Sequence, residues 1–123
     1  MRKCALAFTI GVTLSAVQST IAGEVDVLAV SVKQTSSGIY RFDVSVKHAD
    51  TGWDHYADNW QILGPNGAVI GARVLHHPHV SEQPFTRSLQ RVEIPDAVES
   101  VIVRAHDSVQ GNGGAERTVK LKR

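Results

Sequence analysis

The chain has six histidines among its 123 residues, and all of them fall in or beside three short stretches. The stretches contain His48 and His55, then His76, His77 and His79, and finally His106. Neutral imidazole is the commonest metal ligand in proteins, and it titrates near physiological pH. A fold that brings the three stretches together would therefore indicate a binding site.

The densest stretch, residues 75–80, has a proline between two histidines. Pro78 pushes His77 toward an extended conformation. Residues i and i+2 of an extended segment point the same way, so His77 and His79 are expected to present their imidazoles together. Additional nitrogens and a carboxylate would complete a four-ligand set suited to Zn(II) or Cu(II). The candidate ligands are His77, His79, His55, His106, His76 and Glu82, with Asp54 and Asp107 as alternative carboxylates.

A structural interpretation of the same residues stays open. His76 and His77 would then end a strand, and His79 would pack in a polar loop. His48 continues an apolar strand face, which favours a buried histidine with a hydrogen-bond partner over a metal ligand. Asp107 is expected to orient a neighbouring imidazole by accepting a hydrogen bond from it.

Short runs rich in β-branched and aromatic residues alternate with turn signals along the chain, which is typical of all-β domains. In residues 39–47, Tyr40, Phe42, Val44 and Val46 alternate with polar residues, the period of a half-buried strand. Seven strands are predicted, at residues 25–34, 39–47, 58–63, 68–75, 85–94, 99–105 and 117–121. With Trp60 on the third strand, the pattern resembles a seven-stranded antiparallel immunoglobulin or fibronectin-like sandwich.

The order of the strands predicts where the histidines lie. Alternate connections of an up-and-down antiparallel fold share one end, so residues 48–57, 76–84 and 106–116 should meet there. These connections contain all six histidines, whereas the tight turns at 35–38, 64–67 and 95–97 contain none. Binding groups concentrate on loops that a rigid scaffold presents. We therefore expect one functional end.

Residues 1–22 have the layout of a secretory signal peptide: basic Arg2 and Lys3, an apolar run, and small residues before Gly23. We expect cleavage after Ala22, a single domain over residues 23–123, a periplasmic or secreted location, and no membrane insertion of the mature chain. The single cysteine and single methionine would leave with the signal. Without Arg2 and Lys3, 13 basic residues become 11 against 12 acidic ones, a formal net charge of −1.

This composition excludes several classes of protein. The mature chain lacks the sulfur ligands of blue-copper and Cu(I) sites, the basic stripe of a nucleic-acid-binding protein, and the loop pattern of an EF-hand. An enzyme is not expected. A zinc hydrolase with Glu82 as its base is the enzymatic alternative, but a domain of this size has little room for a substrate pocket.

Two blocks, residues 52–58 (GWDHYAD) and 77–87 (HPHVSEQPFTR), resemble those of small exported bacterial proteins of unassigned role. The resemblance implies no activity and no site residues. The favoured function is binding of Cu(II) or Zn(II) at the histidine-rich end, for storage, delivery or sensing. The alternative is a metal-free module that recognises an envelope protein through the same loops, with binding that changes near pH 6 to 7.

Overall fold

The computed structural model describes residues 23–122, which fold into eight strands and one short 3₁₀ helix. The strands are β1 (Asp26–Ser36), β2 (Ile39–Lys47), β3 (Ala57–Leu63), β4 (Val69–Val74), β5 (Phe85–Glu93), β6 (Ser100–Asp107), β7 (Gly111–Asn112) and β8 (Arg117–Lys120). The helix, η1 (Pro65–Gly67), forms the turn between β3 and β4.

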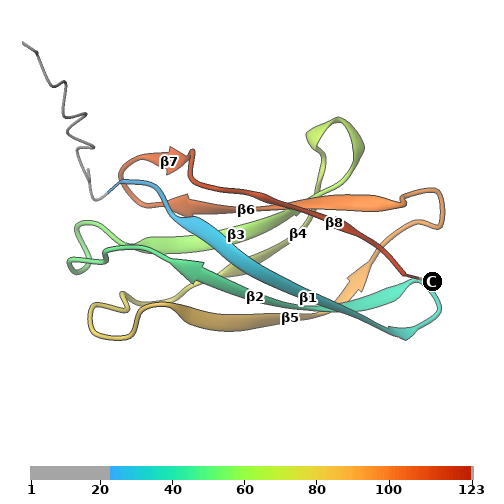
Figure 1. The fold of residues 1–123 in the computed structure, drawn as a ribbon, viewed down its shortest axis with the longest axis horizontal. Helices are drawn as coiled ribbons and strands as arrows, with labels where there is room; N and C mark the ends of the chain where they lie inside the picture. Colours follow the sequence, from blue (N-terminus) through green and yellow to red (C-terminus); the bar gives the residue numbers. More distant parts are fainter. Residues whose placement is uncertain (1–22, 123) are drawn as a thin grey trace, which may run out of the picture.

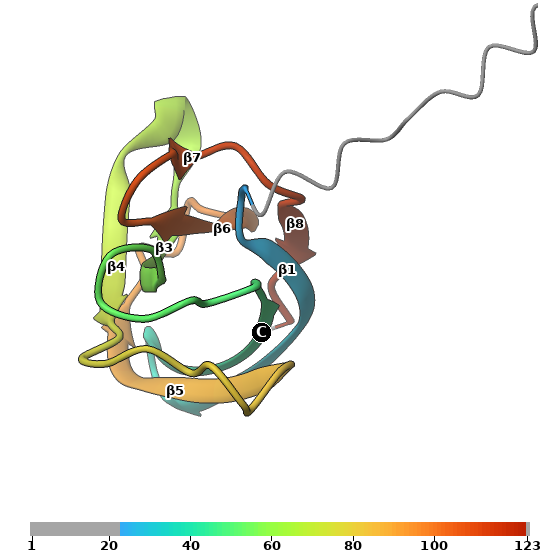
Figure 2. The ribbon, with the colours of Figure 1, turned by 90° about the vertical axis from the view of Figure 1, so that its left-hand side faces the viewer.

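The strands form two open antiparallel sheets that face each other (Figures 1 and 2). One sheet has the order β1-β2-β5. In the other, β3 lies between β4 and β6, and β6 pairs with both β7 and β8. The all-β class and the sandwich-like arrangement are as predicted.

The structure has eight strands, so the predicted count of seven was wrong. The additional strand is β7, two residues within the predicted connection 106–116. It pairs with His106 and Asp107 because the chain turns back directly after β6. The other seven strands lie within two residues of the predicted boundaries. Membership of the immunoglobulin or fibronectin families stays a prediction.

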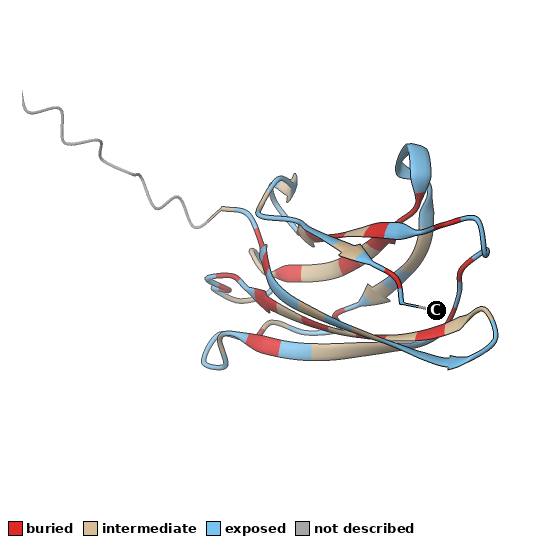
Figure 3. Ribbon diagram, turned by 45° about the vertical axis from the view of Figure 1, so that its right-hand side comes forward, coloured by how far each residue is buried: buried red, intermediate tan, exposed pale blue. Residues whose placement is uncertain are grey.

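The core follows from the period of two along the central strands. Tyr40, Phe42, Val44 and Val46 of β2 are all buried, and they face residues such as Trp60 of the opposite sheet. Figure 3 shows buried positions recurring along the strands between the sheets. Burial of these apolar side chains is the main force that holds the sandwich together, at roughly 25 cal/mol per Å² of apolar surface.

The connections divide between two ends of the sandwich (Figure 1). We call the end formed by connections 48–56, 75–84 and 108–110 the histidine pole, and the end formed by 37–38, 64–68 and 94–99 the turn pole. Five of the six histidines lie in the histidine-pole connections and His106 lies at the end of β6, beside that pole. The predicted gathering of histidines at one end is therefore seen in the structure.

The expected signal peptide, residues 1–22, lies outside the described residues. Among residues 23–122, no helix has the length and apolar character needed to cross a membrane.

Candidate metal centre

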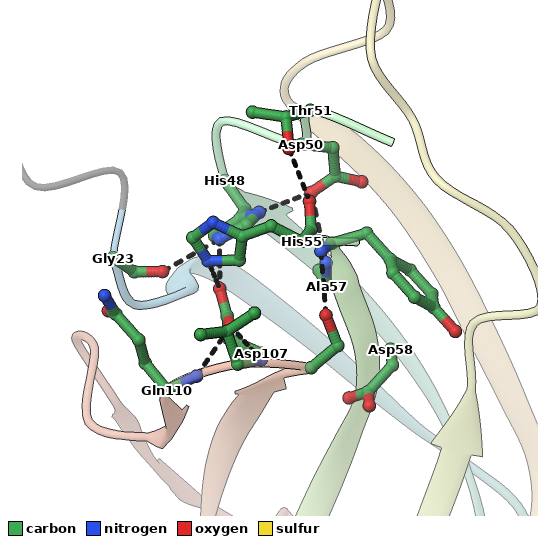
Figure 4. A network of polar contacts seen from close by, with 12 residues as sticks. Gly23, His48, Asp50, Thr51, His55, Ala57, Asp58, Asp107 and Gln110 are labelled. Carbon is green, nitrogen blue, oxygen red and sulfur yellow. Dashed lines mark hydrogen bonds and ion pairs between the residues drawn. The ribbon is translucent and has the colours of Figure 1, made fainter. Parts of the chain in front are cut away.

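Four polar side chains are buried in the described part of the chain, and all four lie at the histidine pole: His48, Asp50, His79 and Asp107. A buried polar group costs free energy unless it is hydrogen-bonded or coordinates a metal. Three of these residues belong to one connected network with His55 (Figure 4).

The centre of the network is one carboxylate oxygen with two imidazole nitrogens facing it. Asp107 Oδ2 lies 2.6 Å from Nε2 of His55 and in direct contact with Nε2 of His48. The two imidazole rings meet edge to face, with centroids 4.9 Å apart. The ligand atoms of the three residues all lie within 4.8 Å of one another. Within residues 23–122, this is the one group of three or more such side chains that could hold a metal ion.

Asp107 is fixed by the turn that follows β6. Its Oδ1 accepts the backbone N–H groups of Val109 (2.6 Å) and Gln110 (2.8 Å), which leaves Oδ2 directed at the histidines. Burial raises the pKa of Asp107, but these two N–H groups and the adjacent histidines outweigh burial. The pKa of Asp107 therefore lies below its ordinary value, so the carboxylate is ionised at neutral pH and ready to bind a cation.

Asp50 contacts the imidazole nitrogen of His48 that faces away from Asp107. Its Oδ1 contacts Nδ1 of His48 and also accepts the N–H of Ala57 (3.1 Å), while its Oδ2 accepts the N–H of His79 (2.7 Å). A carboxylate on one imidazole nitrogen fixes the tautomer and directs the other nitrogen toward a metal. Asp50 therefore positions His48 Nε2 toward Asp107 and also joins two connections of the pole.

His55 is presented by a tight loop. Thr51 N–H donates to the carbonyl of His55 at 3.0 Å, and His55 N–H donates to the carbonyl of Gly52 at 3.2 Å. Gly52 has φ +147°, a conformation that side-chain-bearing residues rarely adopt. The side chain of His55 is 17% exposed, whereas His48 is 1% exposed and Asp107 is fully buried. The centre therefore has one side near solvent, from which a metal could enter.

The arrangement is chemically suited to a cation. When Nδ1 of His48 donates its proton to Asp50, Nε2 carries only a lone pair, and that lone pair faces the Asp107 carboxylate. Two imidazoles and one carboxylate are a common donor set for catalytic or exchangeable Zn(II) sites. Ligands of tetrahedral Zn(II) lie roughly 3.3 Å apart, given Zn–N and Zn–O distances of about 2.0–2.2 Å. The observed contacts would lengthen by less than about 1 Å to admit the ion.

Two of the three histidines of the densest stretch, His77 and His79, lie beside each other but outside the group of three. The rings of His77 and His79 have centroids 4.6 Å apart, and His79 also stacks on Phe85 at 3.9 Å. Nε2 of His79 accepts from Arg87 (2.9 Å). Burial lowers the pKa of His79, and the nearby charges of Arg87 and His77 lower it further. The imidazole of His79 is therefore neutral at pH 7, and one nitrogen already has a partner.

The other predicted ligands are dispersed. His106 points to the outer face of its sheet, where its Nδ1 contacts Asp58 at 2.6 Å. His76 is exposed and lines an open surface pocket with Asp58 and Tyr56. Glu82 lies 3.7 Å from Arg87. Of the predicted ligands, the structure thus brings His55 and the alternative carboxylate Asp107 into the group of three.

The sequence contained a signal for His48, which the ligand prediction omitted, and for Asp107, which it named only as an alternative carboxylate. His48 follows Tyr40, Phe42, Val44 and Val46 at the same spacing of two, which places it on the inner face of β2. Asp107 likewise continues the buried alternation of β6, while His106 takes the outer face. Each of these polar residues continues the apolar inner face of its strand at the strand's end. Two such residues at the same pole predict a buried polar pair. The prediction that Asp107 orients an imidazole agrees with its contact to His55.

No family model matches the chain, and no solved structure matches it. A protein of Halomicrobium mukohataei named "Putative lipoprotein" is 38% identical over 96 residues, which are 78% of this chain and 47% of that protein. The chain therefore spans about half the length of the curated relative it matches.

Proposed function

We propose that this protein binds one divalent transition metal, Zn(II) or Cu(II), through His48 Nε2, His55 Nε2 and Asp107 Oδ2. The observation that carries the proposal is the convergence of two imidazole nitrogens on one ionised carboxylate oxygen. Imidazole and carboxylate donors without sulfur favour these two ions. The partly exposed side of the centre suits exchange of the metal, as storage, delivery or sensing would require.

The competing explanation for the same contacts is a purely structural network. Without a metal, each Nε2 must carry a proton to donate to Asp107, and His48 must carry a second proton on Nδ1. Such a network would hold the pole together, and it would bind Zn(II) only weakly because the ion would have to displace these protons.

Calorimetric titration with Zn(II) and with Cu(II) distinguishes the two explanations. We expect one equivalent to bind with submicromolar affinity, and His55→Ala to weaken binding by at least about 100-fold, since outer-shell partners alone contribute 10–100-fold. His106→Ala is the matched control, because His106 also pairs with an aspartate at 2.6 Å but lies outside the centre. Absence of binding in the unaltered protein, or an equal loss in both variants, would reject this ligand set.

We further propose that the protein is exported to the periplasm or secreted. The layout of residues 1–22 and the name of the Halomicrobium relative support this location. Mass spectrometry of the protein purified from cell fractions tests it. The expected form begins at Gly23 and is found outside the cytoplasm, and a full-length cytoplasmic form would contradict it.

A metal-free recognition module is the second candidate, and one observation favours it. Each of the three histidine-pole connections carries an exposed apolar side chain: Trp53 (67% exposed), Val80 (59%) and Val109 (61%). Exposed apolar groups at loop tips are typical of contact sites. This candidate predicts that Trp53→Ala abolishes binding of an envelope partner while leaving metal affinity unchanged, and that a chelator does not release the partner.

A further inference from the structure

The beginning of the described chain passes directly across the metal centre. The carbonyl oxygen of Gly23 lies 2.8 Å from Nε2 of His48, the nitrogen that also faces Asp107 (Figure 4). A backbone oxygen from before the first strand thus joins donors from the 48–56 connection and from the end of β6.

The segment formed by residues 23–27, here the N-terminal segment, is held in place by the residues that directly follow this contact. Val25 and Val27 are buried in the core. The N–H of Val27 donates to the carbonyl of Ala115 at 2.8 Å, and the N–H of Ala115 donates to Asp26 Oδ1 at 2.8 Å. These contacts tie the segment to the chain between β7 and β8 and set the position of Gly23.

Two glycines allow the N-terminal segment to pass. A Cβ atom at Gly114 would lie 2.0 Å from the carbonyl oxygen of Val25, a distance that requires the backbone to move. At Gly113, the nearest atom to such a Cβ would be the side-chain Oε1 of Glu24, at 2.8 Å, which can swing away. The Gly-rich stretch 111–114 therefore does more than turn the chain, because its last glycine provides room for the segment that carries Gly23.

We propose that the carbonyl oxygen of Gly23 is the fourth ligand of the metal, so that metal binding fastens the N-terminal segment across the centre. This inference rests on the proposed metal-binding function. Nε2 of His48 has one in-plane lone pair or one proton, yet two oxygen atoms face it. A cation with four coordination positions satisfies both oxygens and both imidazoles, whereas a single proton cannot. Backbone oxygens are known metal ligands beside imidazole.

The consequence is a coupling between metal loading and the start of the chain. The metal would join β1 through Gly23, the connection after β2 through His48 and His55, and β6 through Asp107. Ordering of a segment by a bound cation is a general form of switch. Loading would thus be reported by the N-terminal segment as well as by the site itself.

Carbonyl and ring NMR of the unaltered protein during titration with Zn(II) alone tests the inference directly. We expect the ¹³C signal of the Gly23 carbonyl to shift with the ring signals of His48 and His55, all saturating at one equivalent. Hydrogen exchange at the Val27 amide should slow over the same range.

Two adjacent variants provide the matched comparison. Gly114→Ala displaces the backbone of the N-terminal segment and should weaken Zn(II) binding by about 10-fold or more, as loss of a supporting group does. Gly113→Ala meets only the flexible end of Glu24 and should change binding by no more than about twofold.

The outcomes separate the inference from the function on which it rests. Ring shifts without a change at the Gly23 carbonyl or the Val27 amide would overturn the inference and leave metal binding standing. Absence of any ring response would overturn both. A shift of the carbonyl that tracks the rings supports both, even where Gly114→Ala fails to fold.

Discussion

The two poles of the sandwich stabilise their loops by different means. At the turn pole, backbone hydrogen bonds close the loops. Ile94 N–H donates to the carbonyl of Gly38 at 3.0 Å, and Gly64 N–H donates to the carbonyl of Ala68 at 2.8 Å. Gly38 and Gly67 adopt positive φ so that the turns can close. At the histidine pole, buried side chains bind one another, and within the described residues every buried polar side chain is there.

This difference indicates where function lies. Tight backbone turns connect strands without burying any polar side chain, as the turn pole demonstrates. A sandwich therefore has no structural need to bury two histidines and two aspartates at one end. Buried polar groups raise the cost of every imperfect contact. The proposed metal site of His48, His55 and Asp107 would account for this cost.

The largest expected effect comes from removing the central carboxylate. Asp107→Ala leaves two imidazoles and the N–H groups of Val109 and Gln110 without their acceptor. Loss of one partner of a buried charged pair costs about 3–5 kcal/mol. Urea unfolding of the metal-free protein should show this loss, and calorimetry should show no Zn(II) binding.

Asp107→Asn is the control for this change. Its amide oxygen still accepts the two N–H groups of the turn, so most of the stability should return while Zn(II) affinity stays low. Recovery of full affinity in Asp107→Asn would contradict direct ligation by the carboxylate.

The second largest effect is on metal affinity and comes from Asp50, which orients His48. Asp50→Asn removes the charge that fixes His48 and replaces one acceptor oxygen with a donor. Loss of such an orienting group lowers metal affinity by about 10–100-fold. Asp54→Asn, an exposed change in the same connection, should leave affinity unchanged. Equal affinities for both variants in calorimetry would show that Asp50 has no orienting role.

At the turn pole, a comparable disturbance should affect stability alone. Gly38 has φ +73°, and alanine there is strained by about 1–2 kcal/mol. Gly38→Ala should lower the free energy of unfolding by this amount, while Gly38→Asn, which tolerates positive φ, should lower it less. Zn(II) affinity should be the same in both. A change in Zn(II) affinity would mean that the two poles are coupled and would contradict their separate roles in stability and metal binding.

The smallest expected effect is a pH-dependent change in stability at Asp43, which lies at neither pole. The hydroxyl of Ser88 lowers the pKa of Asp43 on the outer face of β2; burial opposes this, and Arg41 lowers the pKa further. Because the folded pKa lies below the ordinary value of 3.8, the contribution to stability is present above that value and is lost as pH falls through the folded pKa.

Ser88→Ala should therefore reduce stability at pH 6 by only roughly a few tenths of a kcal/mol, since Asp43 is one-third exposed and screened by solvent. The difference between the two proteins should shrink as the pH falls through the folded pKa of Asp43, which lies below 3.8. Thermal unfolding at pH 6 and at a series of acidic pH values measures it. A difference independent of pH would indicate that packing, not the charge of Asp43, is responsible.

Much of the fold could be predicted from the sequence because alternation along the strands is a local property. Residues 39–47 were predicted with the observed bounds, and the tight turns were marked by glycine, proline and asparagine. The short strand β7 could not be predicted in this way. Gly111 and Asn112 carry no strand pattern, and they pair with β6 only because the preceding turn at Asp107 reverses the chain.

The pole at which the group of three lies could be predicted, but the group itself could be predicted only in part. Counting connections placed the histidines at one end, since antiparallel strands fix which loops meet. The density of histidines at 76–79 favoured His77 and His79 as ligands, and the structure does not bring these two into the group of three. Which side chains converge depends on strand register across the two sheets, and a spacing within one stretch carries no such information. The inner-face positions of His48 and Asp107 were the better guide.

Crystals of the protein grown with one equivalent of Zn(II), with diffraction data collected at the zinc absorption edge, test the central claim most directly. We predict one anomalous peak within about 2.3 Å of His48 Nε2, His55 Nε2 and Asp107 Oδ2. A peak confined to the His76–His79 stretch, or no peak between these three side chains, would contradict the assignment of the metal centre.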